Sequence, residues 1–424
     1  MITLIKGGMV LNPATGLCGV NDVLVVDETV AEIGPQISAE AHRVIDASGR
    51  YVMPGFVDLH EHLREPGFEY KETIASGAMA AAAGGFTTIC PMPNTQPVID
   101  SRVMVEYLNF KAEKDALINI IPVGAVTVGQ QGSELADIEG MAAAGALALS
   151  EDGKSVMDPF LYREGMKRAA AAGLVVLAHC EDRRLLAGGV MNAGKKAEEL
   201  GLSGITNSVE DVIAARDILL AKETGVRLHL CHCSTADSVA LVRLGKELGV
   251  RLSAEVCPHH FAMTEDDIPG DDANYKMNPP LRTRADTDAL IAGLADGTME
   301  VIATDHAPHS AQEKERSFRS APFGIVGSET AFALSYTELV KKGHLTPMQL
   351  VEKLSTNPAR ILGIDKGDIS QGHIADLVIA DPEAEYTIDV NTFLSKGKNS
   401  PFHGKRVFGK IMLTMVNGEI VYEV

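Results

Sequence analysis

Two histidines, His60 and His62, close an apolar run in the sequence Asp58-Leu59-His60-Glu61-His62. Residues two apart on a strand point to the same side, so both imidazole rings can reach one point in space. Neutral imidazole is a ligand for zinc and related divalent metals. A single pair of this kind is a weak signal, so the hypothesis of a metal centre depends on where other potential ligands fall.

Four further metal-type side chains follow other apolar runs, namely Asp152, His179, His232 and Asp305. If these runs are strands of one parallel barrel, their carboxyl ends form one rim, where the active sites of such barrels are built. Together with His60 and His62, the six side chains would suffice for two metal ions with one shared carboxylate. Two ions about 3.5–4 Å apart can hold a hydroxide at neutral pH.

For other histidines near these strand ends, the sequence gives weaker evidence of a place in the metal site. His229 lies three residues before His232, and its opposite parity on the strand predicts a side chain that faces outward. For His259 and His260, which follow a later run, two interpretations stay open: contact with the site, or packing alone.

The elements that would position these residues alternate along the middle of the chain. Short β-rich runs occur at residues 51–58, 86–91, 118–126, 146–150, 174–179, 226–232, 251–256 and 300–304. Between them, apolar residues at three- and four-residue spacing predict helices at 73–83, 158–172, 209–224, 236–248 and 285–295. Alternating strands and helices imply a parallel sheet, and eight such units imply a (β/α)₈ TIM barrel of roughly 250 residues.

The two ends of the chain have a different character. Residues 1–54 hold short alternating runs broken by Gly and Pro, and residues 366–424 repeat this pattern, with Asn417-Gly418 as a hairpin signal. Because chain termini often lie close together, the ends can form one small composite β-sandwich domain. We therefore predict an α/β protein of two domains, residues 1–54 plus 366–424 and a barrel at 55–365.

The composition excludes several classes of function. The 424 residues include 38 Lys and Arg against 57 Asp and Glu, a net charge of −19. Such a surface repels phosphate backbones and anionic lipid, so binding to nucleic acid or to a membrane is not expected. No apolar run approaches the length of a membrane span, and no targeting signal is visible. The six cysteines form no CxxC pair, which is typical of reduced thiols and predicts a cytoplasmic location.

A series of longer motifs extends from residue 54 to about 330, and Asn357-Pro358-Ala359-Arg360 continues it. These motifs are Asp58-Leu59-His60-Glu61-His62-Leu63-Arg64-Glu65-Pro66-Gly67, Lys71-Glu72-Thr73, Gly84-Gly85-Phe86-Thr87-Thr88, Met92-Pro93-Asn94-Thr95, Lys276-Met277-Asn278-Pro279-Pro280-Leu281-Arg282, Thr304-Asp305-His306-Ala307-Pro308-His309 and Ala321-Pro322-Phe323-Gly324. In combination they closely resemble the dihydroorotases of the amidohydrolase superfamily, in particular the long bacterial type. The resemblance implies a hydrolase of cyclic amides with a TIM barrel and a small β-domain.

The same resemblance implies two Zn²⁺ ions per subunit. His60, His62 and Asp305 would hold one ion and His179 and His232 the other. Many members of the superfamily bridge the two ions with a carbamylated lysine. Here Asp152 stands at that position, so the expected bridge is Asp152 and a hydroxide.

The implied reaction is the reversible, zinc-dependent cyclisation of N-carbamoyl-L-aspartate to L-dihydroorotate and water, in de novo pyrimidine (UMP) biosynthesis. Asp305 would be the catalytic group that moves the proton. Arg64 can bind the substrate carboxylate through two parallel hydrogen bonds. The metal ions, Arg64 and His309 would supply the local positive potential that an acidic substrate needs. The expected substrate contacts are His62, Arg64, Asn94, Asn278, His309, Phe323 and Gly324.

Alternatives stay open at this point. A hydantoinase/dihydropyrimidinase or an allantoinase would use the same metal chemistry, but its substrates lack the ring carboxylate that Arg64, Asn94 and His309 would bind. An inactive scaffold for aspartate transcarbamoylase is a more remote alternative, since all six ligands are present. A homodimer and an association with aspartate transcarbamoylase are further expectations for an active enzyme.

Overall fold

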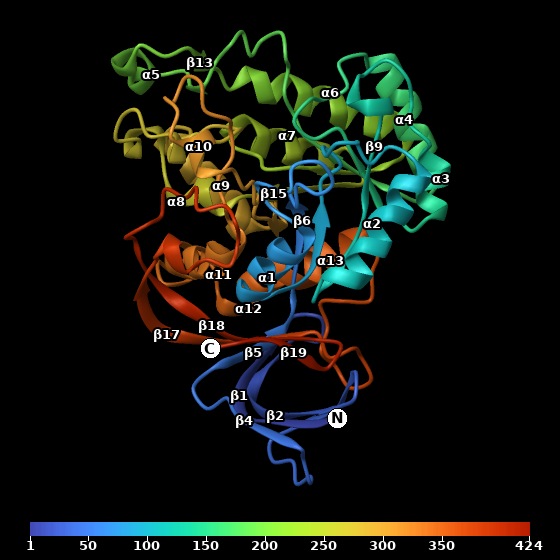
Figure 1. Cartoon of the computed structure of the whole chain (residues 1–424), viewed down its shortest axis with the longest axis vertical. Helices are drawn as coiled ribbons and strands as arrows, with labels where there is room; N and C mark the ends of the chain where they lie inside the picture. Colours follow the sequence, from blue (N-terminus) through green and yellow to red (C-terminus); the bar gives the residue numbers. More distant parts are fainter.

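Short parallel strands form the centre of the larger part of the molecule in the computed structural model, which describes residues 1–424 (Figure 1). They are β6 (Phe56–Glu61), β7 (Phe86–Pro91), β8 (Asn119–Ile120), β9 (Val123–Ala125), β10 (Ala148–Ser150), β11 (Val175–Ala178), β14 (Arg227–Leu230), β15 (Leu252–Val256) and β16 (Val301–Ile302). They pair in the orders β6-β7-β8 and β9-β10-β11-β14-β15-β16.

These strands close into a barrel. The predicted run 118–126 forms β8 and β9 as two pieces of one strand, separated at Ile121-Pro122, where the proline has no N–H to donate. A parallel bridge between Glu61 and His306 links β6 to the segment after β16. The prediction of a (β/α)₈ barrel is therefore confirmed.

One predicted strand is divided in the structure. The run 51–58 breaks at Gly55 into β5 (Tyr51–Pro54), which joins the terminal sheet, and β6, which opens the barrel. No side chain fits at Gly55, because an added Cβ would lie 2.2 Å from Oγ1 of Thr87. The break coincides with the predicted boundary after residue 54; that boundary and the one before residue 366 remain predictions.

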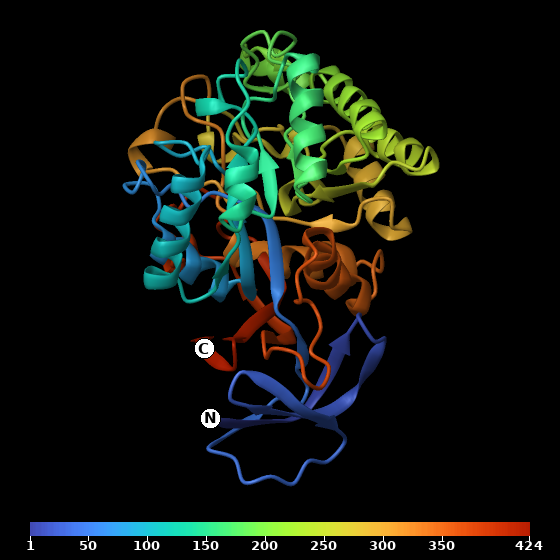
Figure 2. The same cartoon turned by 90° about the vertical axis from the view of Figure 1, so that its right-hand side faces the viewer.

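Helices cover the outside of the barrel (Figures 1 and 2). The five predicted helices are present within one residue at each end, as α1 (Ile74–Ala83), α4 (Pro159–Ala171), α6 (Ser208–Thr224), α7 (Ala236–Glu247) and α9 (Arg284–Asp296). Helices absent from the prediction are α2 (Arg102–Asp115), α3 (Ile138–Ala143), α5 (Lys195–Leu200), α8 (Pro258–Ala262), α10 (Ala311–Lys314), α11 (Ala331–Ser335), α12 (Pro347–Val351) and α13 (Asn357–Leu362). In α2 only Val105 and Leu108 are buried, so its apolar face is too narrow to show in the sequence.

The two ends of the chain build one mixed sheet beneath the barrel, and both termini lie at that end (Figure 2). Its strands are β1 (Ile2–Asn12), β2 (Leu17–Val26), β3 (Thr29–Gly34), β4 (Arg43–Asp46), β5, β17 (Leu377–Thr387), β18 (Arg406–Val416) and β19 (Glu419–Glu423). Antiparallel pairing of β17 with β5 joins the two ends. The predicted hairpin is present, since Asn417 and Gly418 connect β18 to β19 with positive φ at both residues. The composite β-domain is thus confirmed.

Apolar side chains fill the two faces of the barrel wall. A large cluster lies between strands and helices, and a smaller one, with Val57, Leu59, Val175 and Leu177, lies inside the barrel. The site described below sits above this inner cluster, at the carboxyl ends of the strands. None of the helices has the length and apolar character needed to span a membrane.

Candidate metal centre and active site

The six predicted ligands meet at the carboxyl ends of five strands. His60 and His62 lie at the end of β6, Asp152 follows β10, and His179 follows β11. His232 and Asp305 follow β14 and β16. All six side chains are buried. The sequence prediction that they share one rim of the barrel agrees with this placement.

Asp152 lies at the centre of the group. Its Oδ1 is 3.3 Å from Nε2 of His60, 3.4 Å from Nδ1 of His179 and 3.8 Å from Nε2 of His232. Its Oδ2 is 3.6 Å from Nε2 of His62. One carboxylate therefore faces all four imidazoles, which is the geometry that a bridging ligand requires.

Asp305 also lies close to His60 and His62. Its Oδ1 lies 3.2 Å from Nε2 of His62 and 3.5 Å from Nε2 of His60. Burial alone would raise the pKa of Asp305, but the neighbouring His60 and His62 hold that pKa well below its ordinary value. The side chain is thus an ionised carboxylate that faces the centre of the site.

Unusual backbone angles direct two of these side chains. His232 has φ 33° and Asp305 has φ 46°, in the left-handed region that residues other than glycine seldom adopt. His232 lies two residues beyond the end of β14 and Asp305 three residues beyond the end of β16, where the alternation of sides no longer holds. Strained backbone of this kind is commonly found at functional sites.

The prediction for His229 is wrong. His229 is fully buried, its Nδ1 lies 2.8 Å from Oγ of Ser253 and its Nε2 lies 2.8 Å from Oε2 of Glu255. It therefore faces the barrel interior. The prediction assumed that side chains alternate between the two sides of the strand as far as His232. The strand ends before His232, where φ is positive, so the side on which His229 lies cannot be deduced from that of His232.

The donor atoms fit a metal centre. Nε2 of His60 and Nε2 of His179 are buried without any hydrogen-bond partner. Nδ1 of His179 and Nε2 of His232 face each other at 2.9 Å. Buried polar atoms are nearly always paired, so imidazole nitrogens without a hydrogen-bond partner in such a group fit the role of metal ligands.

The clustering of the ligand atoms supports the same interpretation. One ligating atom from each of His60, His62 and Asp305 lies within 4.8 Å of the others, and the same holds for His60, Asp152 and His232. Imidazole and carboxylate donors suit zinc and other divalent ions. His179 joins the group through Asp152 and His232, as its distances show.

A pocket of about 190 Å³ opens above the cluster. Arg64, Asn94, Asn278, Phe323 and Gly324, all predicted to contact substrate, line it together with His62, Asp152, His179, His232 and Asp305. The structure thus brings most of the predicted substrate contacts to one hollow beside the candidate metal centre.

The two asparagines of this pocket are tied to charged neighbours. Asn94 donates to Oδ2 of Asp152 at 2.9 Å, and its Oδ1 lies 3.1 Å from Nδ1 of His62. Asn278 donates to Oε2 of Glu181 at 2.5 Å. Asn94 therefore orients two candidate metal ligands, in addition to lining the pocket.

His309 does not line this pocket. Its Nε2 donates to the carbonyl oxygen of Phe323 at 2.7 Å, and Nζ of Lys71 lies 3.3 Å from its Nδ1. Burial, followed by the cations Arg64 and Lys71, lowers the pKa of His309 to about 2. The ring is therefore neutral, and the expectation that it adds positive charge is wrong. Its contact with substrate remains a prediction.

Comparison with known proteins places the chain in a family. Residues 49–238 match the family model described as dihydro-orotase-like. The chain is 49% identical over 423 residues to a dihydroorotase from Pelotomaculum thermopropionicum, covering 100% of this chain and 99% of that protein. The chain belongs to the dihydroorotase family. A dihydroorotase from Acetivibrio thermocellus is 48% identical over 418 residues, covering 99% of this chain and 98% of that protein.

Solved structures of related enzymes share the fold of this dihydroorotase family member. An L-hydantoinase from Arthrobacter aurescens superposes with a TM-score of 0.89 at 28% identity, covering 99% of this chain and 96% of that one. A dihydropyrimidinase from Brevibacillus agri gives 0.87 at 26% identity, covering 100% and 95%. The parallel barrel with a terminal β-sandwich is therefore the architecture of this wider group.

Sequence reasoning missed Glu255, a fully buried carboxylate on β15. Its Oε1 lies 3.2 Å from Nδ1 of His60 and accepts a hydrogen bond from the backbone N–H of His232 at 3.0 Å. Burial opposes its ionisation, but His229 and His60 lower the pKa of Glu255 to about 2. A carboxylate behind a ligating histidine fixes the ring and its tautomer, so Nε2 of His60 is free to face a metal.

Replacing Glu255 by glutamine should lower metal affinity by about 10–100-fold, because the carboxylate that orients His60 is lost. Competition against a chelator measures this affinity. Glu247→Gln, on the exposed end of α7, is the matched control and should leave metal affinity unchanged. Equal affinities in Glu255→Gln and wild type would remove the orienting role from Glu255.

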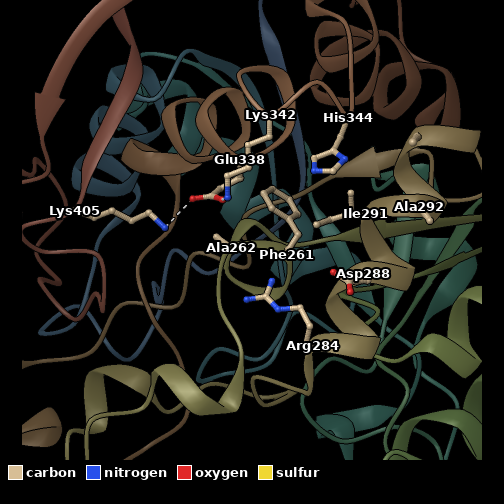
Figure 3. A pocket seen from close by; sticks show the side chains of 11 residues that line it. Phe261, Ala262, Arg284, Asp288, Ile291, Ala292, Glu338, Lys342, His344 and Lys405 are labelled. Atoms are coloured by element: carbon tan, nitrogen blue, oxygen red, sulfur yellow. Dashed lines mark hydrogen bonds and ion pairs between the residues drawn. The ribbon is translucent and has the colours of Figure 1, made fainter.

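A second cavity, of about 500 Å³, lies between α8, α9 and the helical segment around Glu338 (Figure 3). Its lining includes Arg284, Asp288 and a single histidine, His344, and its Glu338 pairs with Lys405 at 2.9 Å. A single histidine and one unpaired carboxylate do not make a metal centre, so the active site is assigned to the cluster around Asp152.

Proposed function

We propose that the chain catalyses the reversible cyclisation of N-carbamoyl-L-aspartate to L-dihydroorotate and water, a step in pyrimidine biosynthesis. Full-length identity of 48–49% to dihydroorotases supports this reaction. The observation that carries it is the pocket that Arg64 lines together with three of the four candidate histidine ligands and both aspartates. That arrangement offers a carboxylate-binding cation next to a hydrolytic centre.

For the cofactor, the proposal is two Zn²⁺ ions. His60, His62 and Asp305 would hold one ion, and His179 and His232 the other. Asp152, whose two oxygens face all four histidines, would bridge them. When bound, such ions polarise a carbonyl oxygen and lower the pKa of water to about 7.

Asp305 would move the proton of the reaction. In ring opening, its carboxylate accepts a proton from the attacking water and delivers it to the leaving ring nitrogen. In ring closure, it takes a proton from the attacking carbamoyl nitrogen. Asp305 lines the pocket and its Oδ1 lies 3.2 Å from Nε2 of His62, which supports this role.

The remaining pocket residues would hold the substrate. Arg64 would bind the carboxylate that lies outside the reacting bond, with Asn94 beside it and His309 behind. Nε of Arg64 already donates to the carbonyl oxygen of Pro308 at 3.2 Å, and one of its terminal amino groups lies 3.4 Å from Nε2 of His309. Asn278 and the backbone at Phe323 and Gly324 would contact the ring amides.

Replacing Arg64 by alanine should raise KM for dihydroorotate by at least about tenfold, because a hydrogen bond between charged groups is lost. Activity on hydantoin and dihydrouracil, neutral cyclic amides, should not change in parallel. Steady-state kinetics on this panel measures both effects. Arg284→Ala, in the exposed cavity of Figure 3, is the matched control.

The same panel tests the function itself. Dihydroorotate should be the preferred substrate of the wild type over hydantoin, dihydrouracil and allantoin. Preference for a neutral ring would favour the hydantoinase alternative, whose fold is the same. A homodimer, an association with aspartate transcarbamoylase and a cytoplasmic location remain predictions.

A further inference from the structure

A loop of the terminal β-domain reaches the rim of the barrel. The loop connects β17 to β18 and contains Asn399, whose side chain is buried at 4% exposure. Its amide nitrogen donates to the carbonyl oxygens of Ala307 at 3.1 Å and Gly324 at 3.0 Å. Its Oδ1 accepts from the backbone N–H of His309 at 3.0 Å. One side chain thus ties together two segments of the pocket wall.

The backbone of Asn399 strengthens the same connection. Its carbonyl oxygen accepts from the N–H of Val326 at 2.9 Å. The segment after β16 and the segment around Gly324 also contact each other directly, since the backbone N–H of Ala307 donates to the carbonyl oxygen of Ile325 at 2.8 Å. Asn399 adds a donor and an acceptor to this contact from a third segment of the chain. A carboxamide supplies both kinds of group at once.

The position of Gly324 leaves little room for movement. Its φ is 127°, and an added Cβ would lie 2.8 Å from Cβ of Ala307 and 3.1 Å from Nε2 of His309. Its carbonyl oxygen also accepts from Nζ of Lys314 at 2.9 Å. The backbone that lines the pocket at Phe323 and Gly324 is therefore held from behind by two side chains.

We propose that Asn399 is a positioning residue for substrate binding, which fixes the Gly324 carbonyl and the His309 backbone so that the pocket wall is set before substrate arrives. This inference rests on the proposed function, because it assigns Phe323 and Gly324 to the substrate ring. Asn399 touches no candidate metal ligand in the structure, so its effect should fall on binding rather than on the metal centre.

The test replaces Asn399 by aspartate, which keeps the acceptor for His309 and replaces the donor by an oxygen that faces two carbonyls. KM for dihydroorotate should rise at least about tenfold, with kcat within about threefold of wild type and metal content unchanged. Asn399→Ala, which lacks the repulsion, should show the same pattern and serves as the measured variant if the aspartate form does not fold. Asn391→Asp, on the exposed part of the same loop, is the control.

A merely structural role would give a different pattern. The melting temperature and kcat would fall together while KM stayed at the wild-type value, and that result would overturn the proposal. Loss of bound metal in Asn399→Ala would also overturn it. Failure of the wild type to act on dihydroorotate would instead contradict the proposed function, so the two failures are distinguishable.

Discussion

Replacing Asp305 by asparagine should lower kcat in both directions by about 10³-fold, because general acid–base catalysis of this kind contributes about 10²–10⁴-fold. Asparagine keeps an oxygen at the same position but cannot take up the proton. Its oxygen can still contact a metal ion beside His60 and His62. The loss should therefore appear in turnover more than in metal content.

Rates of ring opening and ring closure, measured on protein whose metal content has been counted, test this expectation. Asp288→Asn, an exposed carboxylate of the cavity in Figure 3, is the matched control and should retain full activity. If Asp305→Asn kept more than a tenth of wild-type turnover, Asp305 would not be the group that transfers the proton.

Removal of the Asp152 carboxylate should have an effect of similar size through metal binding. Asp152→Ala lacks the carboxylate that faces all four candidate histidine ligands. We expect at most one metal ion per chain and a loss of activity above about 100-fold, beyond the range seen for groups that only support a ligand.

Mass spectrometry of the intact protein under native conditions gives the metal count, and the ring-opening assay gives the activity. Asp288→Ala, on the surface of α9, controls for the loss of an aspartate without a role in the site. An Asp152→Ala variant that keeps the wild-type metal count would show that Asp152 does not bridge.

Much of the candidate site could be predicted because its residues lie at strand ends. His60 and His62 lie on the same side of the chain at the end of β6. The carboxyl ends of parallel strands meet at one rim, so the positions of the six ligands in the sequence were enough to predict that they cluster. The prediction failed where that regularity ends. His229 was assigned to the wrong side, because the chain turns at His232 with positive φ.

Other contacts could not be predicted, because they depend on packing between distant segments. Glu255 lies within an apolar run, where nothing marks it as the partner of His60. Asn399 lies in the C-terminal part of the chain that forms the β-domain, and only the folded structure brings it into contact with Gly324. The neutral state of His309 follows from burial beside Arg64 and Lys71, which the order of residues does not reveal.

We expect this chain to need bound metal to interconvert dihydroorotate and N-carbamoyl-aspartate. This requirement is tested by measuring ring opening of dihydroorotate by the wild type as purified, after removal of metal by a chelator, and after Zn²⁺ is added back, with metal counted at each stage. Activity should be present with metal, be lost on chelation and return when Zn²⁺ is added. No turnover by metal-replete protein, or full turnover by metal-free protein, would contradict it.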